Sequence, residues 1–383
     1  MRGSDAGRQV SMFVLSPEEM IPADHPIRRI RRLVDAELAA LDGVFEAMYS
    51  AVGRPSIPPE RLLRAQLLIA LYTVRSERQF CERLRYDFLF RWFVGLDPDE
   101  VPFDASTFSQ NRERLIRHDA AGRFFRAVVE RAGREGLISD EHFSVDGTLI
   151  EAWASFKSLK PRDDADRKDD GGDRDGSGPG DSACAATPQD APAPPRHRNA
   201  EVDFRGRPRG NETHRSATDP EALLARKSAG KEARLAFAGH ALMENRNGLC
   251  VDVRVTRATG TAERDAGAEM VRDHKKRCGA MKTVGADKGY DTPGFVEAVR
   301  AAGVTPHVAA KAKGSAIDAR TTRHAGYAAS RWCRKRIECI FGWLKTIGGL
   351  RKTRFRGTDR TGLWAYLSAA AYNLVRMARL LPA

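Results

Sequence analysis

The residues best suited to chemistry in this chain are three acids that lie in three different kinds of segment. Asp146 falls inside an alternating run, residues 142–155, that is typical of a strand, and Asp287 directly follows a short apolar strand. Glu338 lies in a helical stretch, residues 331–345, where it is the one acid on a basic stripe. Each acid alone also has an ordinary explanation: a bulge or turn at Asp146, a loop cap at Asp287 and an intrahelical ion pair at Glu338.

Together, the three acids predict a site for divalent metal ions. If the strands of Asp146 and Asp287 are neighbours in one sheet, their carboxylates converge, and the helix of Glu338 can add a third. Acids without charge partners repel each other unless a cation joins them. Oxygen ligands without His or Cys favour Mg²⁺, with Mn²⁺ as a substitute. Two such ions about 4 Å apart promote in-line phosphoryl displacement, which predicts a metal-dependent nuclease or strand transferase.

The composition favours a soluble protein with a polyanionic partner. The chain has 383 residues, of which 42% are hydrophobic, a formal net charge of +13 and a pI near 9.7. Generic solubility or an acidic membrane surface would explain the charge equally well. Six cysteines without a CxxC pair argue against a zinc site and fit a cytoplasmic protein. The longest apolar run, residues 62–74, is too short to span a bilayer.

The periodicity divides the chain into a helical region, residues 1–136, and an α/β region, residues 137–383. The helical region offers one candidate face for DNA. One predicted helix, capped by Asp104 or Ser106, places on its exposed face side chains that suit phosphates and base edges: Gln110, Asn111, Arg112 and Arg114. A merely solvated helix face explains these four residues equally well.

The order of elements after residue 141 predicts a mixed α/β layer. The strand of Asp146 is followed by a hairpin, residues 235–257, with a turn at Asn245-Arg-Asn-Gly, and then by alternating helices and strands. The closing helix is expected at 364–381. Residues 158–215 interrupt this order with a charged stretch, rich in Gly, Pro and Ala up to residue 200, which cannot bury enough apolar surface to order itself. We expect a disordered or poorly ordered insertion there.

Five stretches carry a resemblance to a known family: Val145-Asp-Gly-Thr, Gly239-His-Ala-Leu-Met-Glu-Asn-Arg-Asn-Gly-Leu, Ala258-Thr-Gly-Thr-Ala-Glu-Arg, Gly285-Ala-Asp-Lys-Gly-Tyr-Asp and residues 334–357. In them the chain resembles the DDE transposases of bacterial insertion sequences, in the branch called the insertion-sequence-five family. The family signature is Tyr, two residues, Arg, three residues, Glu, six residues, Lys. Arg334, Glu338 and Lys345 fit this spacing, whereas Arg331 occupies the Tyr position. Tyr327 lies one turn earlier.

The resemblance implies an RNase H-like catalytic core with two Mg²⁺ ions held by Asp146, Asp287 and Glu338. It also implies cutting and joining at terminal inverted repeats and target DNA, a dimer on DNA, and a place in the bacterial cytoplasm, associated with the nucleoid. The basic residues expected at the DNA are Arg331, Arg334, Lys335, Lys345, Arg351, Lys352, Arg354 and Arg356. For Arg334 and Lys345, a salt bridge to Glu338 is the alternative.

Two other functions stay open from the sequence. One is an RNase H-like nuclease that cleaves but does not join DNA. The other is a non-catalytic DNA-binding protein, such as a repressor or the product of a decayed element.

Overall fold

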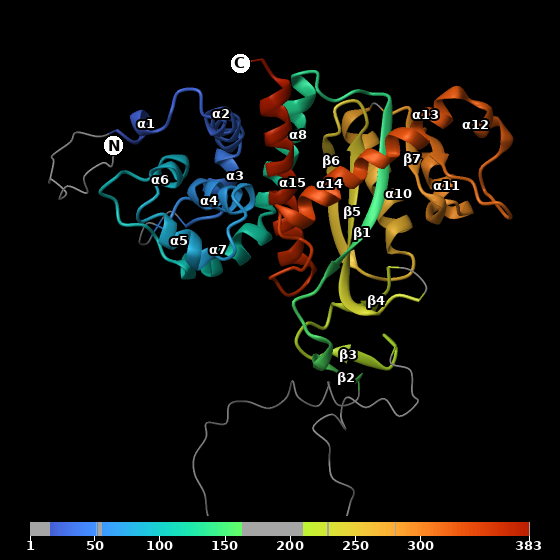
Figure 1. Ribbon diagram of the computed structural model, residues 1–383, viewed down its shortest axis with the longest axis horizontal. Helices are drawn as coiled ribbons and strands as arrows, with labels where there is room; N and C mark the ends of the chain where they lie inside the picture. Colours follow the sequence, from blue (N-terminus) through green and yellow to red (C-terminus); the bar gives the residue numbers. More distant parts are fainter. Residues whose placement is uncertain are drawn as a thin grey trace, which may run out of the picture.

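The computed structural model describes residues 16–50, 52, 56–162, 210–227, 230–279 and 281–382. A group of helices lies on one side of the molecule and a mixed α/β layer on the other, as Figure 1 shows. The last helix, α15 (Thr358–Leu380), stands between them next to α8 (Ala120–Arg134). In the described parts of the chain, no helix is long and apolar enough to cross a membrane.

The helical region follows the predicted periodicity closely. The helix expected to be buried nearly all round, α4, has nine buried residues, and Asp104 caps α7 by accepting a hydrogen bond from the Ser106 N–H. Helices α2, α3, α5 and α6 each contribute buried side chains to the same core, whereas α1 has no buried residue. Their bounds are α1 (Pro17–Met20), α2 (Pro26–Ala39), α3 (Asp42–Glu46), α4 (Pro59–Leu71), α5 (Glu77–Arg83), α6 (Phe88–Val94) and α7 (Ala105–Arg117).

The α/β layer is built on one curled, mixed sheet of the RNase H-like kind, as predicted. Its order is β4-β5-β1-β7-β8, and β6 also pairs with β5. Pairing is antiparallel among β1, β4, β5 and β6, and parallel from β1 through β7 to β8. The bounds are β1 (His142–Glu151), β4 (Leu223–Ala225), β5 (Arg234–Glu244), β6 (Cys250–Arg257), β7 (Thr283–Ala286) and β8 (Thr305–Val308).

Helices follow the strands in the predicted order, and the longest of them, α10, packs on β5, β6 and β1. The hairpin predicted at 235–257 is the β5–β6 pair. The helices of this layer are α10 (Ala262–Cys278), η2 (Lys288–Tyr290), α11 (Pro293–Ala301), α12 (Ala319–Arg323), α13 (Ala325–Cys333), η3 (Arg334–Arg336) and α14 (Ile337–Thr346).

The stretch expected as one helix, residues 331–345, is divided into three pieces. The end of α13 and the start of α14 are joined by the tighter 3₁₀ turn η3. The apolar stripe is otherwise correct, since Ile337, Ile340 and Leu344 are buried. In the turn, the Arg334 guanidinium donates a hydrogen bond to Asp146 on β1, so the tighter segment is anchored on the sheet.

The ends of the predicted insertion are ordered, contrary to the expectation for 158–215. Strand β2 (Leu159–Pro161), which follows η1 (Phe156–Ser158), pairs antiparallel with β3 (His214–Ser216). Backbone hydrogen bonds and a contact between the Ser158 and Ser216 hydroxyls close this ribbon. The interior of the insertion, residues 163–209, lies outside the described residues.

The two predicted regions share one hydrophobic core. Nearly all buried apolar side chains form one continuous cluster that includes members from Ile21 to Met377, and a second cluster holds only three alanines. Helix α15 contacts α8, α4 and α2 on one side and β6 on the other. The closing helix therefore begins six residues before the predicted position 364 and joins both regions, which bury apolar surface against it.

Candidate active site

Asp146 lies on β1 just beyond the point where β7 stops pairing with it. Strand β5 accompanies β1 along its whole length, whereas β7 pairs only with residues 142–144. Strand β7 ends at Ala286, and Asp287 follows at once. The parallel pairing therefore places Asp146 and Asp287 beside the same strand end, as the sequence predicted.

Asp287 is fixed by its own loop. Its Oδ1 accepts a hydrogen bond of 2.7 Å from the Gly289 N–H, which caps the short helix η2. Asp146 is held similarly, because its Oδ1 accepts a hydrogen bond of 2.9 Å from the Gly147 N–H. In both carboxylates, one oxygen therefore accepts a hydrogen bond from a backbone N–H.

The electrostatic setting of Asp146 is that of a buried acid among other acids. The pKa of Asp146 is raised to about 6, chiefly by burial and to a smaller extent by the charges of Asp287 and Glu263. The Gly147 hydrogen bond and the charge of Arg334 act in the opposite direction. Arg334 Nη1 lies 3.2 Å from Asp146 Oδ2, and both side chains are about four-fifths buried. Arg334 therefore pairs with Asp146 rather than with Glu338.

Glu338, the third predicted acid, lies on a helix rather than on the sheet. It lies in the first turn of α14, is exposed, and makes no hydrogen bond or ion pair with the described residues. Its helix packs on β1 and β5, and Arg334, one turn earlier, reaches Asp146. Across the described part of the chain, no three Asp, Glu, His or Cys side chains lie close enough to hold a metal ion as they stand. Binding by all three acids would require side-chain reorientation.

The basic residues around α14 divide into exposed and engaged side chains. Arg331, which stacks over the Tyr327 ring at 5.8 Å, and Lys335 are both exposed. Lys345 is half-buried and donates a hydrogen bond to the Thr148 hydroxyl, two residues after Asp146 on β1. The pKa of Lys345 is lowered, first by burial and then by the charges of Lys227 and Arg351.

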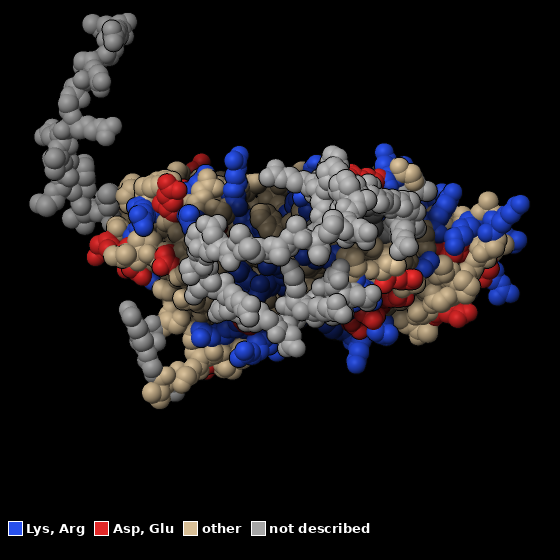
Figure 2. All heavy atoms as spheres, turned by 90° about the horizontal axis from the view of Figure 1, so that it is seen from below, with Lys and Arg blue, Asp and Glu red and all other residues tan. Residues whose placement is uncertain are grey.

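The loop before α15 also carries both exposed basic side chains and basic side chains engaged in contacts. Arg351 and Arg356 are exposed, and Lys352 pairs with Glu151 at 3.1 Å. Arg354 is instead part of the packing, because its guanidinium lies 5.0 Å from the Trp364 ring centre and donates a hydrogen bond to a backbone carbonyl. Figure 2 shows Lys and Arg side chains across the lower face of the molecule, including its middle.

The expectation of one exposed, polar face on α7 is wrong for three of its four residues. Gln110 is exposed as predicted, but Asn111 is buried and donates a hydrogen bond to the backbone of its own helix. Arg112 pairs with Glu77 at 2.5 Å and stacks on Phe355. Arg114 donates to Asn111 and stacks at 4.5 Å on Tyr49. These guanidiniums hold the helices together, which amphipathic periodicity could not reveal.

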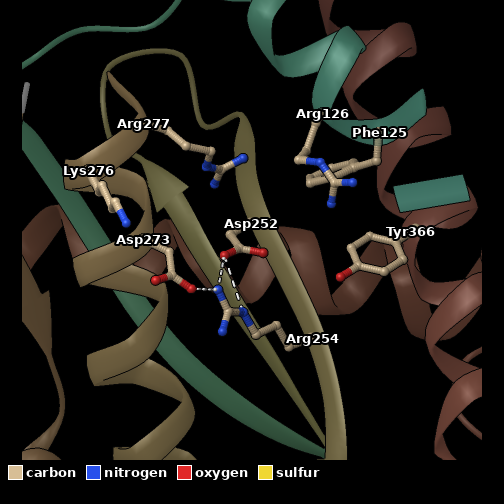
Figure 3. A pocket seen from close by; sticks show the side chains of 8 residues that line it. All are labelled: Phe125, Arg126, Asp252, Arg254, Asp273, Lys276, Arg277 and Tyr366. Atoms are coloured by element: carbon tan, nitrogen blue, oxygen red, sulfur yellow. Dashed lines mark hydrogen bonds and ion pairs between the residues drawn. The ribbon is translucent and has the colours of Figure 1, made fainter. Parts of the chain in front are cut away.

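A polar cavity of about 440 Å³ lies elsewhere, between α8, β6, α10 and α15 (Figure 3). At its centre Arg254 pairs with Asp252 at 3.0 Å, Asp273 at 2.7 Å and Glu269 at 3.2 Å. The basic residues Arg126, Lys276 and Arg277 and the rings of Phe125 and Tyr366 complete the lining. The far end of α10 forms this cavity, about 15–20 Å along the helix from Glu263. It is therefore distinct from the acids at the end of β7.

Two residues for which the sequence predicts no role lie near the acids. Glu263, in the first turn of α10, and Tyr290, at the end of η2, both lie among the charges of Asp146 and Asp287. Both fall in stretches that carry the family resemblance, and this was the only signal available. Their approach depends on tertiary packing of α10 against β1.

Two family descriptions match the chain. Residues 15–114 match the "Transposase domain (DUF772)" and residues 209–374 match the "Transposase DDE domain". Curated proteins give no match. Among solved structures, the chain is similar to the "piggyBac transposase synaptic complex with hairpin DNA", at 10% identity and a TM-score of 0.39, covering 93% of this chain and 73% of the other. Because residues 15–114 and residues 209–374 both match descriptions of transposase domains, the second of them a DDE domain, the chain is an enzyme of the DDE transposase class.

Proposed function

We propose that this transposase belongs to an insertion sequence of the insertion-sequence-five type in bacteria. It would cleave DNA at the terminal inverted repeats and transfer the 3′-OH ends to target DNA. The observation that carries the proposal is the convergence of Asp146 and Asp287 at the end of β7, next to the helix that bears Glu338.

The donor set fits divalent ions such as Mg²⁺ or Mn²⁺. Asp146, Asp287 and Glu338 offer only carboxylate oxygens, which are the ligands that these ions prefer. The raised pKa of Asp146 marks a carboxylate that gains from a neighbouring cation. A pair of bound ions would activate the attacking hydroxyl and stabilise the leaving oxygen.

The basic residues of the site would position the DNA. Arg334 donates a hydrogen bond to Asp146, and Lys345 donates one to Thr148, two residues further along β1. Both basic side chains therefore lie beside Asp146. Phosphate contacts by such side chains fix the register of a duplex without reading its sequence. Exposed Arg331, Lys335, Arg351 and Arg356 can extend this contact. Two element ends in one event favour a dimer on DNA, by symmetry.

The proposal is tested with purified full-length protein and a DNA carrying the inverted repeats of its element. Asp146→Asn, Asp287→Asn and Glu338→Gln should each abolish Mg²⁺-dependent cutting while specific end binding survives. Glu297→Gln, at an exposed glutamate on α11, is the matched control and should cut normally. Retained cutting by any of the three acid variants would refute its assignment. A pre-cleaved end should be joined to target DNA, whereas a simple nuclease would leave it unjoined.

A further inference from the structure

We propose that Glu263 turns toward Asp146 and Asp287 and helps them to hold the divalent cation, an inference that rests on the proposed function. As the three side chains stand, they are not yet close enough to share an ion, so the site forms by side-chain reorientation. Glu263 belongs to α10, a different element from the three that supply the predicted acids. Helix α10 packs on β1, and there the Glu263 side chain lies against Gly147.

Gly147 is the reason that Glu263 can lie against the strand. A Cβ atom at position 147 would stand 2.7 Å from Cγ and 2.8 Å from Cδ and Oε1 of Glu263. Only a residue without a side chain leaves this space, and it is the one directly after Asp146. The Glu263 carboxylate is therefore accommodated beside β1 at the level of the first acid.

The mutual charges of the acids agree with this placement. Asp287 is the strongest neighbouring charge on Glu263, and both Asp287 and Glu263 act on Asp146. Like charges that act on one another in this way are unfavourable without a counterion. The charge of Asp146 is balanced by its ion pair with Arg334. Neither Asp287 nor Glu263 makes an ion pair with the described residues.

The Tyr290 hydroxyl is an independent indication that a ligand binds among Glu263, Asp146 and Asp287. Its side chain is fully buried against α10, yet among the described residues its hydroxyl has no hydrogen-bond partner. The charged groups that act on it are Glu263, Asp146, Asp287 and Arg334, with Glu263 the strongest. An unpaired buried hydroxyl is unfavourable by roughly 1–3 kcal/mol. A hydrated cation among the acids would supply the missing partner.

The test is a Mn²⁺ titration of the full chain without DNA, following the free-ion signal by electron paramagnetic resonance. Glu263→Gln should weaken Mn²⁺ binding by about tenfold or more, in the range for residues that orient or hold a bound metal. Gly147→Ala should also weaken it, because the added methyl displaces the Glu263 side chain. Glu297→Gln should bind as the unchanged protein does. Thermal unfolding without metal checks that each variant is folded.

The outcomes separate this inference from the proposed function. If Asp146→Asn loses Mn²⁺ while Glu263→Gln and Gly147→Ala bind within twofold of the unchanged protein, Glu263 has no part in the site and the inference is wrong. If Asp146→Asn and Asp287→Asn both bind normally, the proposed metal site itself is wrong. If Glu263→Gln does not fold, Gly147→Ala alone decides, since a methyl group at that position removes no polar group.

Discussion

Asp146→Asn should make the metal-free protein more stable at pH 8. The pKa of Asp146 is about 6 in the folded chain, against 3.8 for an unperturbed aspartate. The folded state therefore binds its proton more tightly than the unfolded state does. Stability from this group is complete below about pH 4 and is lost as the pH rises through 6. Asparagine keeps the shape of the side chain and never ionises, so it avoids that loss.

The size of the effect follows from the pKa difference. The difference between a pKa of about 6 in the folded chain and 3.8 in the unfolded chain corresponds to about 3 kcal/mol at pH 8. By the same calculation, the free energy of unfolding of the variant exceeds that of the parent by only about 1 kcal/mol at pH 4.5, where the Asp146 carboxyl of the folded parent is mostly protonated. The side chain is 20% exposed, so solvent screens the group only in part.

Urea titrations of both proteins at pH 4.5 and pH 8, in the presence of a chelator, measure these differences. Asp265→Asn, at an exposed aspartate in the first turn of α10, is the matched control and should show no pH-dependent gain. A variant that is less stable than the parent at pH 8, or an advantage equal at both pH values, would refute the reasoning. Adding Mg²⁺ at pH 8 should stabilise the parent and leave Asp146→Asn unchanged.

Three further perturbations follow from the geometry. Arg254→Met should lower the free energy of unfolding by about 3–5 kcal/mol, because it leaves the buried Asp252 carboxylate without its partner; a loss below about 1 kcal/mol in urea titrations would contradict this. Lys345→Ala should weaken end binding and reduce the slope of log affinity against log salt by about 0.9, measured by fluorescence anisotropy, and an unchanged slope would remove Lys345 from the DNA contact. Gly348→Ala should destabilise the fold by about 1–3 kcal/mol, since a Cβ there stands 2.8 Å from the Leu344 carbonyl oxygen; unchanged thermal unfolding would argue against it.

Elements with strong periodicity were predictable from the sequence, because local patterns specify which face is buried. The β5–β6 hairpin follows from its Asn-Arg-Asn-Gly turn, and α4 from its nearly continuous apolar surface. The meeting of Asp146 and Asp287 was also predictable, since it needs only two parallel neighbours in one sheet. These parts depend on short-range patterns and on general rules of strand order.

Other features depend on side chains that meet from distant segments. The basic residues Arg112 and Arg114 were predicted to face DNA, but they stack on Phe355 and Tyr49, which no helical pattern encodes. The approach of Glu263 depends on the missing side chain at Gly147, more than a hundred residues earlier. No three acids among the described residues lie close enough to hold a metal ion as they stand, so the approach of Glu338 to Asp146 and Asp287 stays a prediction.

The position of α15 has a consequence for synthesis on the ribosome. This helix occupies residues 358–380, yet it supplies much of the surface against which α2, α4 and α8 bury their apolar faces. Chains fold domain by domain as they emerge, but here the first helices must wait for nearly the last segment. A product interrupted before residue 358 would leave those helices exposing apolar surface, so premature termination should yield aggregating or rapidly degraded fragments rather than a separate DNA-binding piece.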